Sequence, residues 1–233
     1  KRLRDRAESE ARRAGDERFA EARASFGTAN VTTSAMHAEI AAVEGADRAI
    51  AIRGSMGMNR NPVHQQFDVD DSRELAAAMR AEHAAPQAAV KFPKPAAEAR
   101  LAGDVLARLV PGGHVFAVTA GFSVTALVLA ALDLTGPADV SIATWSGHVK
   151  KIAAVRDHAN ARSLRLMIGD GFLLQEPKRA LATMGALPVE AVRAPITHAK
   201  VITIRNERWN LTIRGSMNLC ENPRAEQIDI DDS

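Results

Sequence analysis

Cysteine and aromatic residues are scarce in this sequence of 233 residues, and a long apolar run is missing. The single cysteine, Cys220, excludes an internal disulfide framework and is typical of a reducing compartment, so we expect a cytoplasmic protein. No stretch reaches 18 uninterrupted apolar residues, which argues against a transmembrane helix. Aromatic residues make up only 4% of the chain, and no amphipathic helix has an aromatic face, so we expect no membrane partner.

A strong excess of charge is lacking as well. The net charge of +2 and the pI of about 8.9 do not by themselves indicate a nucleic-acid-binding protein. With 46% hydrophobic and 25% charged residues, the composition is ordinary for a soluble globular protein. The chain begins at Lys1 without a methionine and ends in an acidic run, so we expect both ends to be cut from a longer protein.

An internal repeat organises the chain. Residues 36–72 align with residues 197–233 without a gap, at a constant offset of 161 (197 minus 36), and about 14 of 37 positions are identical. Both copies contain Arg-Gly-Ser-Met, Asn-Pro, a glutamine and Asp-x-Asp-Asp-Ser in the same register. Chance does not produce this agreement, so the sequence contains a duplication.

Hydrophobic periodicity predicts an α/β domain with a mixed sheet. In the second copy we expect strands at 115–119, 140–145, 164–168, 190–194, 201–205 and 210–214, and helices at 123–134, 148–161 and 177–184. By the offset, the first copy lacks about 50 residues that correspond to the opening strand–helix–strand–helix of the second. The domains expected are residues 1–72, a linker at 73–112 that contains prolines and a helix at 97–109, and residues 113–233.

The second copy concentrates groups that suit a phosphate. His198 and Lys200 are two residues apart, so on a strand both side chains point to one face. Lysine supplies a point charge, while Ser216 and Asn218 can donate hydrogen bonds to non-bridging oxygens. Gly215 permits a close approach of the backbone, as expected in a substrate-binding turn. A neutral histidine can attack phosphorus, and a charged histidine can donate a proton. A carboxylate such as Glu226 could fix the tautomer of that histidine.

This combination resembles the phospholipase D superfamily, whose signature is His-x-Lys, an acidic residue and a later Gly-Ser-x-Asn. The matches are His198, Lys200, Gly215, Ser216 and Asn218, with Glu226 similar to the downstream acidic residue that supports the histidine. The acidic position after the lysine falls near Arg205, which departs from the family pattern. The resemblance implies a phospholipase D-like mixed sheet flanked by helices. It also implies two lobes related by a pseudo-two-fold axis, of which the first is incomplete at its N-terminus.

Family membership also implies a reaction without metal or cofactor. One histidine attacks a phosphodiester to form a covalent phosphohistidine, a second histidine protonates the leaving group, and water releases the product. Two motifs normally meet within one chain, or across a homodimer interface when each chain has one. We expect a nucleic-acid phosphodiester as the substrate rather than a lipid.

The first copy has lost part of the motif. It keeps His37, Gly54 and Ser55, but it has Glu39 in place of the lysine and Gly57 in place of the asparagine. Glu39 places negative charge where a phosphate oxygen should lie, which is repulsive at short range. This copy cannot be an independent active site. His37 is either a retained catalytic acid facing the pocket of His198, with Ser55 at its wall, or a relic.

Several alternatives remain beside this interpretation. The rival function is a non-catalytic DNA- or protein-binding component on a decayed phospholipase D scaffold. We interpret Cys220 as an ordinary residue, and Trp145 and Trp209 as packing residues rather than base-stacking platforms. The chain lacks ligands at zinc spacing, and its acidic run lacks the glycine and glutamate of a calcium loop, so we expect no metal site.

Overall fold

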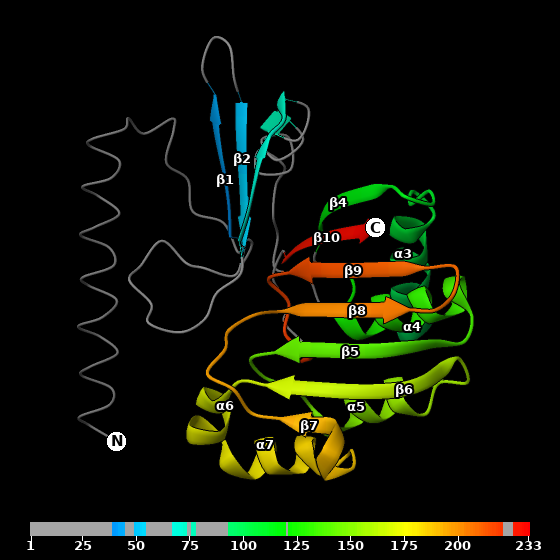
Figure 1. Cartoon of the computed structure of the whole chain (residues 1–233), viewed down its shortest axis with the longest axis vertical. Coiled ribbons are helices and arrows are strands. Elements are labelled where there is room, and N and C mark those ends of the chain that lie inside the picture. The colour runs from blue at the N-terminus through cyan, green and yellow to red at the C-terminus, as the bar shows by residue number, and fades with distance from the viewer. Residues whose placement is uncertain are drawn as a thin grey trace, which may run out of the picture. The chain divides into compact units, whose positions relative to one another are not determined.

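The computed structural model describes residues 39–44, 49–54, 67–73, 76–77, 93–119, 121–220 and 226–233 (Figure 1). All of them belong to one of the two units into which the chain divides, Ala35–Ser233. His37, Ser55 and Gly57 lie outside the described residues, and so does the rest of the chain before residue 39.

A seven-stranded mixed sheet forms the main part of the described structure, which confirms the predicted fold class. Its strand order is β4-β10-β9-β8-β5-β6-β7. The strands are β4 (His114–Thr119), β5 (Ala138–Thr144), β6 (Ala161–Ile168), β7 (Val192–Arg193), β8 (Val201–Arg205), β9 (Asn210–Gly215) and β10 (Glu226–Asp232). The β5–β6 and β6–β7 pairs are parallel, and the other pairs are antiparallel. The expected strand at 190–194 is shorter, because residues Val189–Ala191 form a 3-10 turn.

Five helices are described beside this sheet: α3 (Pro95–Leu106), α4 (Val124–Thr135), α5 (Val149–Arg156), α6 (Asp170–Gln175) and α7 (Pro177–Met184). Figure 1 shows α3, α4 and α5 behind the sheet, and α6 and α7 at its β7 edge. Local chemistry sets the limits of α4: the Ser123 hydroxyl accepts a hydrogen bond from the amide of Ala126, and Gly136 ends the helix with φ 71°. Within the described part of the chain, no helix has the length and apolarity needed to cross a bilayer.

The core lies between the helices and one face of the sheet. Alternate residues of β8 and β9, such as Ile202, Ile204 and Leu211, are buried in the same cluster as Leu127 of α4. Leu106 of α3 is buried there too, so the predicted linker includes a helix that packs on this core. Apart from Val201, the intervening residues on the other face are polar, and all of them are half-buried or exposed. We call this second face the helix-free face, because the helices among the described residues lie on the first face or at the β7 edge.

The repeat is visible in strand pairing. β1 (Glu39–Glu44), β2 (Ala49–Gly54) and β3 (Phe67–Asp71) form an antiparallel three-stranded sheet, as β8, β9 and β10 do. Every described pair in the first copy except Glu39–Gly54 has a counterpart shifted by the same 161 residues: Ile40–Arg53 corresponds to Val201–Arg214, and Ile50–Asp71 to Leu211–Asp232. A gapless repeat with a side-chain period of two must keep its register, or every side chain would change face. The pseudo-two-fold arrangement of the two copies stays a prediction.

Candidate active site

The motif of the second copy lies where the parallel strands β5 and β6 end. His198 and Lys200 lie just before β8, which begins at the predicted residue Val201, so neither residue belongs to the strand itself. The segment before them is tied to the β6–α6 turn, because the amide of Asp170 donates to the carbonyl of Pro195 at 3.1 Å. The carboxyl ends of parallel strands commonly carry functional groups in open α/β sheets.

His198 and Lys200 contact each other directly. The Lys200 Nζ atom lies 2.9 Å from Nδ1 and 3.3 Å from Nε2 of the imidazole, and 2.9 Å from the backbone oxygen of His198. An ammonium group can only donate, so the ring nitrogen that accepts its hydrogen bond carries no proton. The contact therefore favours the neutral imidazole, which is the nucleophilic form.

The lysine is buried although it is charged, with 4% of its surface exposed. Its backbone oxygen accepts a hydrogen bond from the amide of Gly215 at 3.2 Å, which continues the β8–β9 pairing by one step. This bond brings the Gly-Ser turn next to the His-x-Lys segment. The cavity lined by Lys200, Gly215 and Thr144 measures about 10 Å³, which is room for about one water molecule. A substrate must therefore approach from outside the strand ends.

Ser216 and Glu226 form a buried pair. Each is about 1% exposed, and the serine hydroxyl donates to Oε2 of Glu226 while it accepts from the amide of Gln227 at 3.0 Å. A hydroxyl has one proton, so Ser216 cannot donate to a phosphate unless it rotates away from Glu226. The contact described for Glu226 is thus to the serine, and its role as a support for His198 stays a prediction.

Asn218 is oriented by its neighbours. Its Oδ1 atom accepts from the amide of Ser146 at 3.4 Å and lies 3.3 Å from the hydroxyl of Thr144. Because a backbone amide can only donate, the oxygen must face it, and the side-chain NH2 group must point the other way. That orientation leaves the two N–H donors of Asn218 for an anion.

Close packing of two strands requires a glycine at position 215. A Cβ atom at this position would lie 2.4 Å from the carbonyl oxygen of Gln227 in β10, a distance that no side chain tolerates. The glycine therefore allows β9 and β10 to approach. Its predicted contact with substrate stays a prediction.

Trp145, which we expected from the sequence to be only a packing residue, lies next to His198. Its ring centroid lies 5.8 Å from that of His198 and 6.1 Å from that of Phe172, both in tilted orientations. A Cβ atom at Gly169 would lie 2.9 Å from Cδ1 of the indole, and one at Gly171 would lie 3.1 Å from Nε1. The Gly-Asp-Gly turn after β6 thus makes a slot for the indole, and the indole supports the histidine ring.

Arg179 of α7 was not anticipated either. Its guanidinium carbon lies 5.2 Å from the centroid of the Phe172 ring, and its Nε atom donates to the carbonyl of Gly147 at 3.3 Å. It also forms an ion pair with Glu176 at 2.8 Å. Near it, burial raises the pKa of the Cys220 thiol, which agrees with the interpretation of this residue as unreactive.

A second charged cluster lies on β4, β9 and β10. His114 Nε2 is 2.5 Å from Oδ1 of Asp229, and Arg214 forms an ion pair with Asp231. Ligand atoms of His114, Asp229 and Asp231 lie within 4.8 Å of one another. Within the sheet, Asp229 therefore contacts a histidine and Asp231 an arginine.

Truncation of Trp145 should lower activity without unfolding the protein. We expect Trp145→Ala to reduce kcat about tenfold or more with little change in KM, because the histidine ring loses the surface that orients it. Trp145→Phe should retain most of kcat, since a ring remains in the slot. Steady-state kinetics on a chromogenic phosphodiester measure both values. Trp209→Ala, at the other tryptophan, is the control, and equal kcat losses in both Ala variants would refute a positioning role.

Comparisons with known proteins give likenesses to solved structures. No protein-family model matches the sequence, and no curated protein matches it. The chain is similar to the crystal structure of a polyphosphate kinase from Porphyromonas gingivalis, with a TM-score of 0.44 and 11% sequence identity over 84% of this chain. The match covers 32% of that kinase, so this chain spans about a third of its length. The resemblance to the phospholipase D superfamily is carried by the motif of this chain and by its mixed sheet flanked by helices.

Proposed function

We propose that this chain is a phosphodiesterase of the phospholipase D type, which hydrolyses nucleic-acid phosphodiesters through a phosphohistidine at His198. The observation that supports it most is the direct contact of the Lys200 ammonium with the His198 ring, 2.9 Å from Nδ1, beside Ser216 and Asn218 at the strand ends. A lysine in this place keeps the imidazole neutral before substrate binds and supplies a positive charge for the phosphate afterwards.

The reaction has two steps. An imidazole nitrogen of His198 attacks phosphorus, a P–N bond forms, and the P–O bond to the leaving alcohol breaks as that oxygen takes a proton from a second acid. Water then attacks phosphorus and gives a proton to the second group, which is now a base, while the P–N bond breaks and the phosphomonoester leaves. Lys200 and the NH2 group of Asn218 stabilise the non-bridging oxygens in both steps. The second acid is His37, or His198 of a second chain in a homodimer.

A chromogenic diester such as bis(4-nitrophenyl) phosphate tests the activity in the presence of excess EDTA. We expect turnover to persist, because the proposed chemistry uses an imidazole nucleophile and a lysine where two-metal phosphodiesterases use metal ions. Labelled protein trapped during turnover should lose its label in acid and keep it in alkali, and the label should map to His198.

The same experiment has an outcome that contradicts the proposal. Complete loss with EDTA and recovery with manganese would indicate a metal enzyme, and His114→Ala would then show whether the His114–Asp229–Asp231 cluster holds the ion. Absence of turnover together with tight DNA binding would favour the non-catalytic scaffold.

A further inference from the structure

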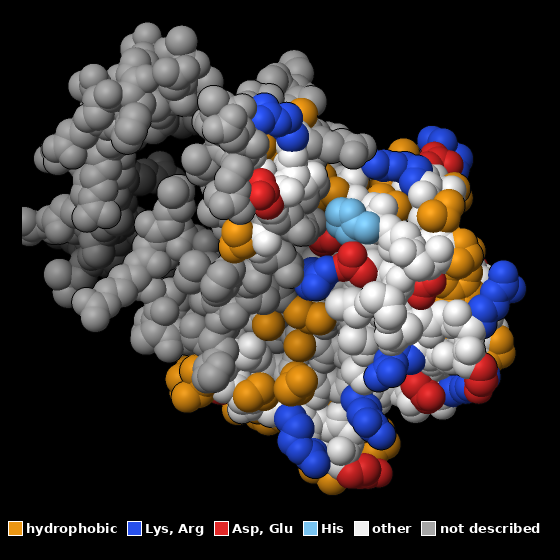
Figure 2. Space-filling model, turned by 45° about the horizontal axis from the view of Figure 1, so that its top comes forward, with side chains coloured by type: hydrophobic (Ala, Val, Ile, Leu, Met, Phe, Trp, Pro, Cys, Tyr) orange, Lys and Arg blue, Asp and Glu red, His pale blue; other side chains and the backbone are white. Residues whose placement is uncertain are grey.

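The helix-free face carries a polar strip across β6, β5 and β8. The strand register places Arg165, Ser141 and Thr203 side by side in one row across the three strands. Ser163, Asp139 and Arg205 form the next row on the same face. Two rows on one face are about 7 Å apart along the strands. Figure 2 shows Lys and Arg side chains close together on part of the face that it presents.

Two hollows follow this strip and share residues. One has a volume of about 350 Å³ and is lined by both rows, including Arg165 and Arg205. The other has a volume of about 460 Å³ and continues from Ser141 and Arg165 to Arg193 of β7. Both hollows include Ser141 and Arg165, so they adjoin at these residues, and together they run obliquely across β8, β5, β6 and β7. We call the two hollows together the groove.

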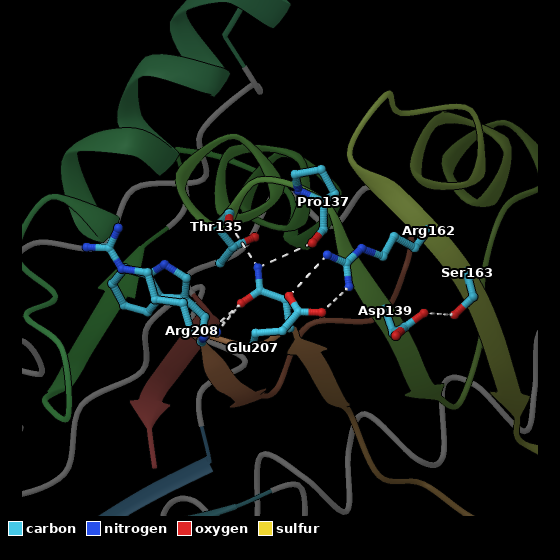
Figure 3. A network of polar contacts seen from close by, with 9 residues as sticks. Thr135, Pro137, Asp139, Arg162, Ser163, Glu207 and Arg208 are labelled. Atoms are coloured by element: carbon cyan, nitrogen blue, oxygen red, sulfur yellow. Dashed lines mark hydrogen bonds and ion pairs between the residues drawn. The ribbon is translucent and has the colours of Figure 1, made fainter.

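The charges in this region divide into paired and unpaired groups. Figure 3 shows the paired groups: Arg162 donates to both oxygens of Glu207 at 2.9 and 3.1 Å, and Ser163 donates to Asp139 at 2.5 Å. The pKa of Glu207 is lowered to about 2 by this arginine. Among the residues that the structure describes, the side chains of Arg165 and Arg205 form neither a hydrogen bond nor an ion pair.

Arg193 extends the basic lining. Its guanidinium donates to the backbone oxygens of Glu190 and Val192, at 3.2 and 2.7 Å, and leaves its charge without a carboxylate hydrogen-bond partner among the described residues. Three arginines thus line the groove, together with the carboxylate residues Asp139 and Glu190. Fixed like charges on neighbouring strands repel each other, so an anion between them is favoured.

We propose that this groove binds the sugar-phosphate backbone of a nucleic-acid strand, an inference that rests on the proposed function and names how the substrate is held. Guanidinium groups match phosphate geometry through bidentate hydrogen bonds, and the hydroxyls of Ser141 and Thr203 are further donors to phosphate oxygens. The residues that line the groove include no aromatic side chain, so bases have no stacking platform and contacts go to the backbone.

The position of the groove agrees with this role. Arg205 lies at the end of β8 far from the motif, whereas Arg193 lies five residues before His198 in the sequence. The groove therefore runs obliquely across the strands from Arg205 toward the end of the sheet where the motif lies. Two rows of donors let the groove hold more than one phosphate of the same strand.

Binding of a fluorescein-labelled single-stranded oligonucleotide tests the groove, measured by anisotropy on the whole chain with His198→Asn to prevent turnover. We expect the double variant Arg165→Gln/Arg205→Gln to raise Kd about 25-fold at 0.1 M salt. The slope of log K against log salt should fall by about 1.4, because two phosphate contacts are lost at about 0.7 each.

The control removes the same charge from the helix side. Arg100 and Arg156 are paired with Asp104 and Asp157, and Arg100→Gln/Arg156→Gln should change Kd less than about threefold. The proposal that the groove binds the strand would be contradicted by an unchanged Kd in the Arg165/Arg205 variant. It would also be contradicted if both double variants raised Kd equally.

A second measurement separates this idea from the proposed function. In the chain that keeps His198, Arg165→Gln/Arg205→Gln should leave turnover of the small chromogenic diester unchanged, since that substrate does not reach the groove. If the unaltered chain does not cleave the diester, yet oligonucleotide binding depends on these arginines, the proposed phosphodiesterase activity is contradicted while nucleic-acid binding in the groove is supported. Loss of small-diester turnover in the double variant would contradict a role limited to binding the strand.

Discussion

Replacing His198 by asparagine is expected to lower kcat for a phosphodiester by at least about four orders of magnitude. Asparagine keeps a polar side chain beside Lys200, but it has no nitrogen that can attack phosphorus and form a covalent intermediate. Removal of the nucleophile in enzymes that work through a covalent intermediate gives losses of this size or larger. Single-turnover kinetics with a labelled diester measure both the rate and the covalent species.

His148→Asn is a matched control for this change. His148 is exposed and caps α5 by accepting a hydrogen bond from the amide of Lys150, a role that asparagine fulfils well. The same substitution there should therefore leave both stability and turnover nearly unchanged. If the His198 variant kept normal activity, or if the labelled intermediate still formed in it, His198 would not be the nucleophile.

The parts of the fold that sequence predicted are those set by local patterns. The strand Val201–Arg205 and the helix Pro177–Met184 have the predicted limits, because alternation fixes the strand and the proline at the first turn fixes the helix start. The six-residue helix α6 was missed, since a single turn and a half gives too few residues for a period to be recognised.

The contacts of the site depend on strand order and could not be read from spacing. Ser216 contacts Glu226 because β9 and β10 pair with Gly215 opposite Ile228. No local sequence pattern predicts that register. Trp145 meets His198 because the segment before β8 crosses the end of β5. The arginine groove arises because β6, β5 and β8 are neighbours in the sheet although β6 and β8 are separated by two helices in the chain.

Neutralising Lys200 is expected to give the second-largest loss. Lys200→Met has a similar length and no charge, so the variant should lose about 10²- to 10³-fold in kcat/KM, as when a preorganised group that stabilises transition-state charge is removed. Protein stability should change little. Lys200 is 4% exposed, and its ammonium contacts the ring and the backbone oxygen of His198.

Removal of one partner of a buried hydrogen bond costs about 1–3 kcal/mol, whereas removal of a buried charge is favourable, so we expect the Tm of Lys200→Met to change by only a few degrees. Activity is measured well below that Tm, where the variant is folded. A loss of kcat/KM at that temperature separates a catalytic lysine from a structural one, because a structural lysine would lose activity only as the protein unfolds. Lys200→Arg tests shape at constant charge: the larger guanidinium does not fit the closed space beside Gly215, so we expect it to lower Tm and to restore little activity. A Lys200→Met variant with full activity would show that phosphate charge is neutralised elsewhere, and Arg179 would be the next residue to substitute.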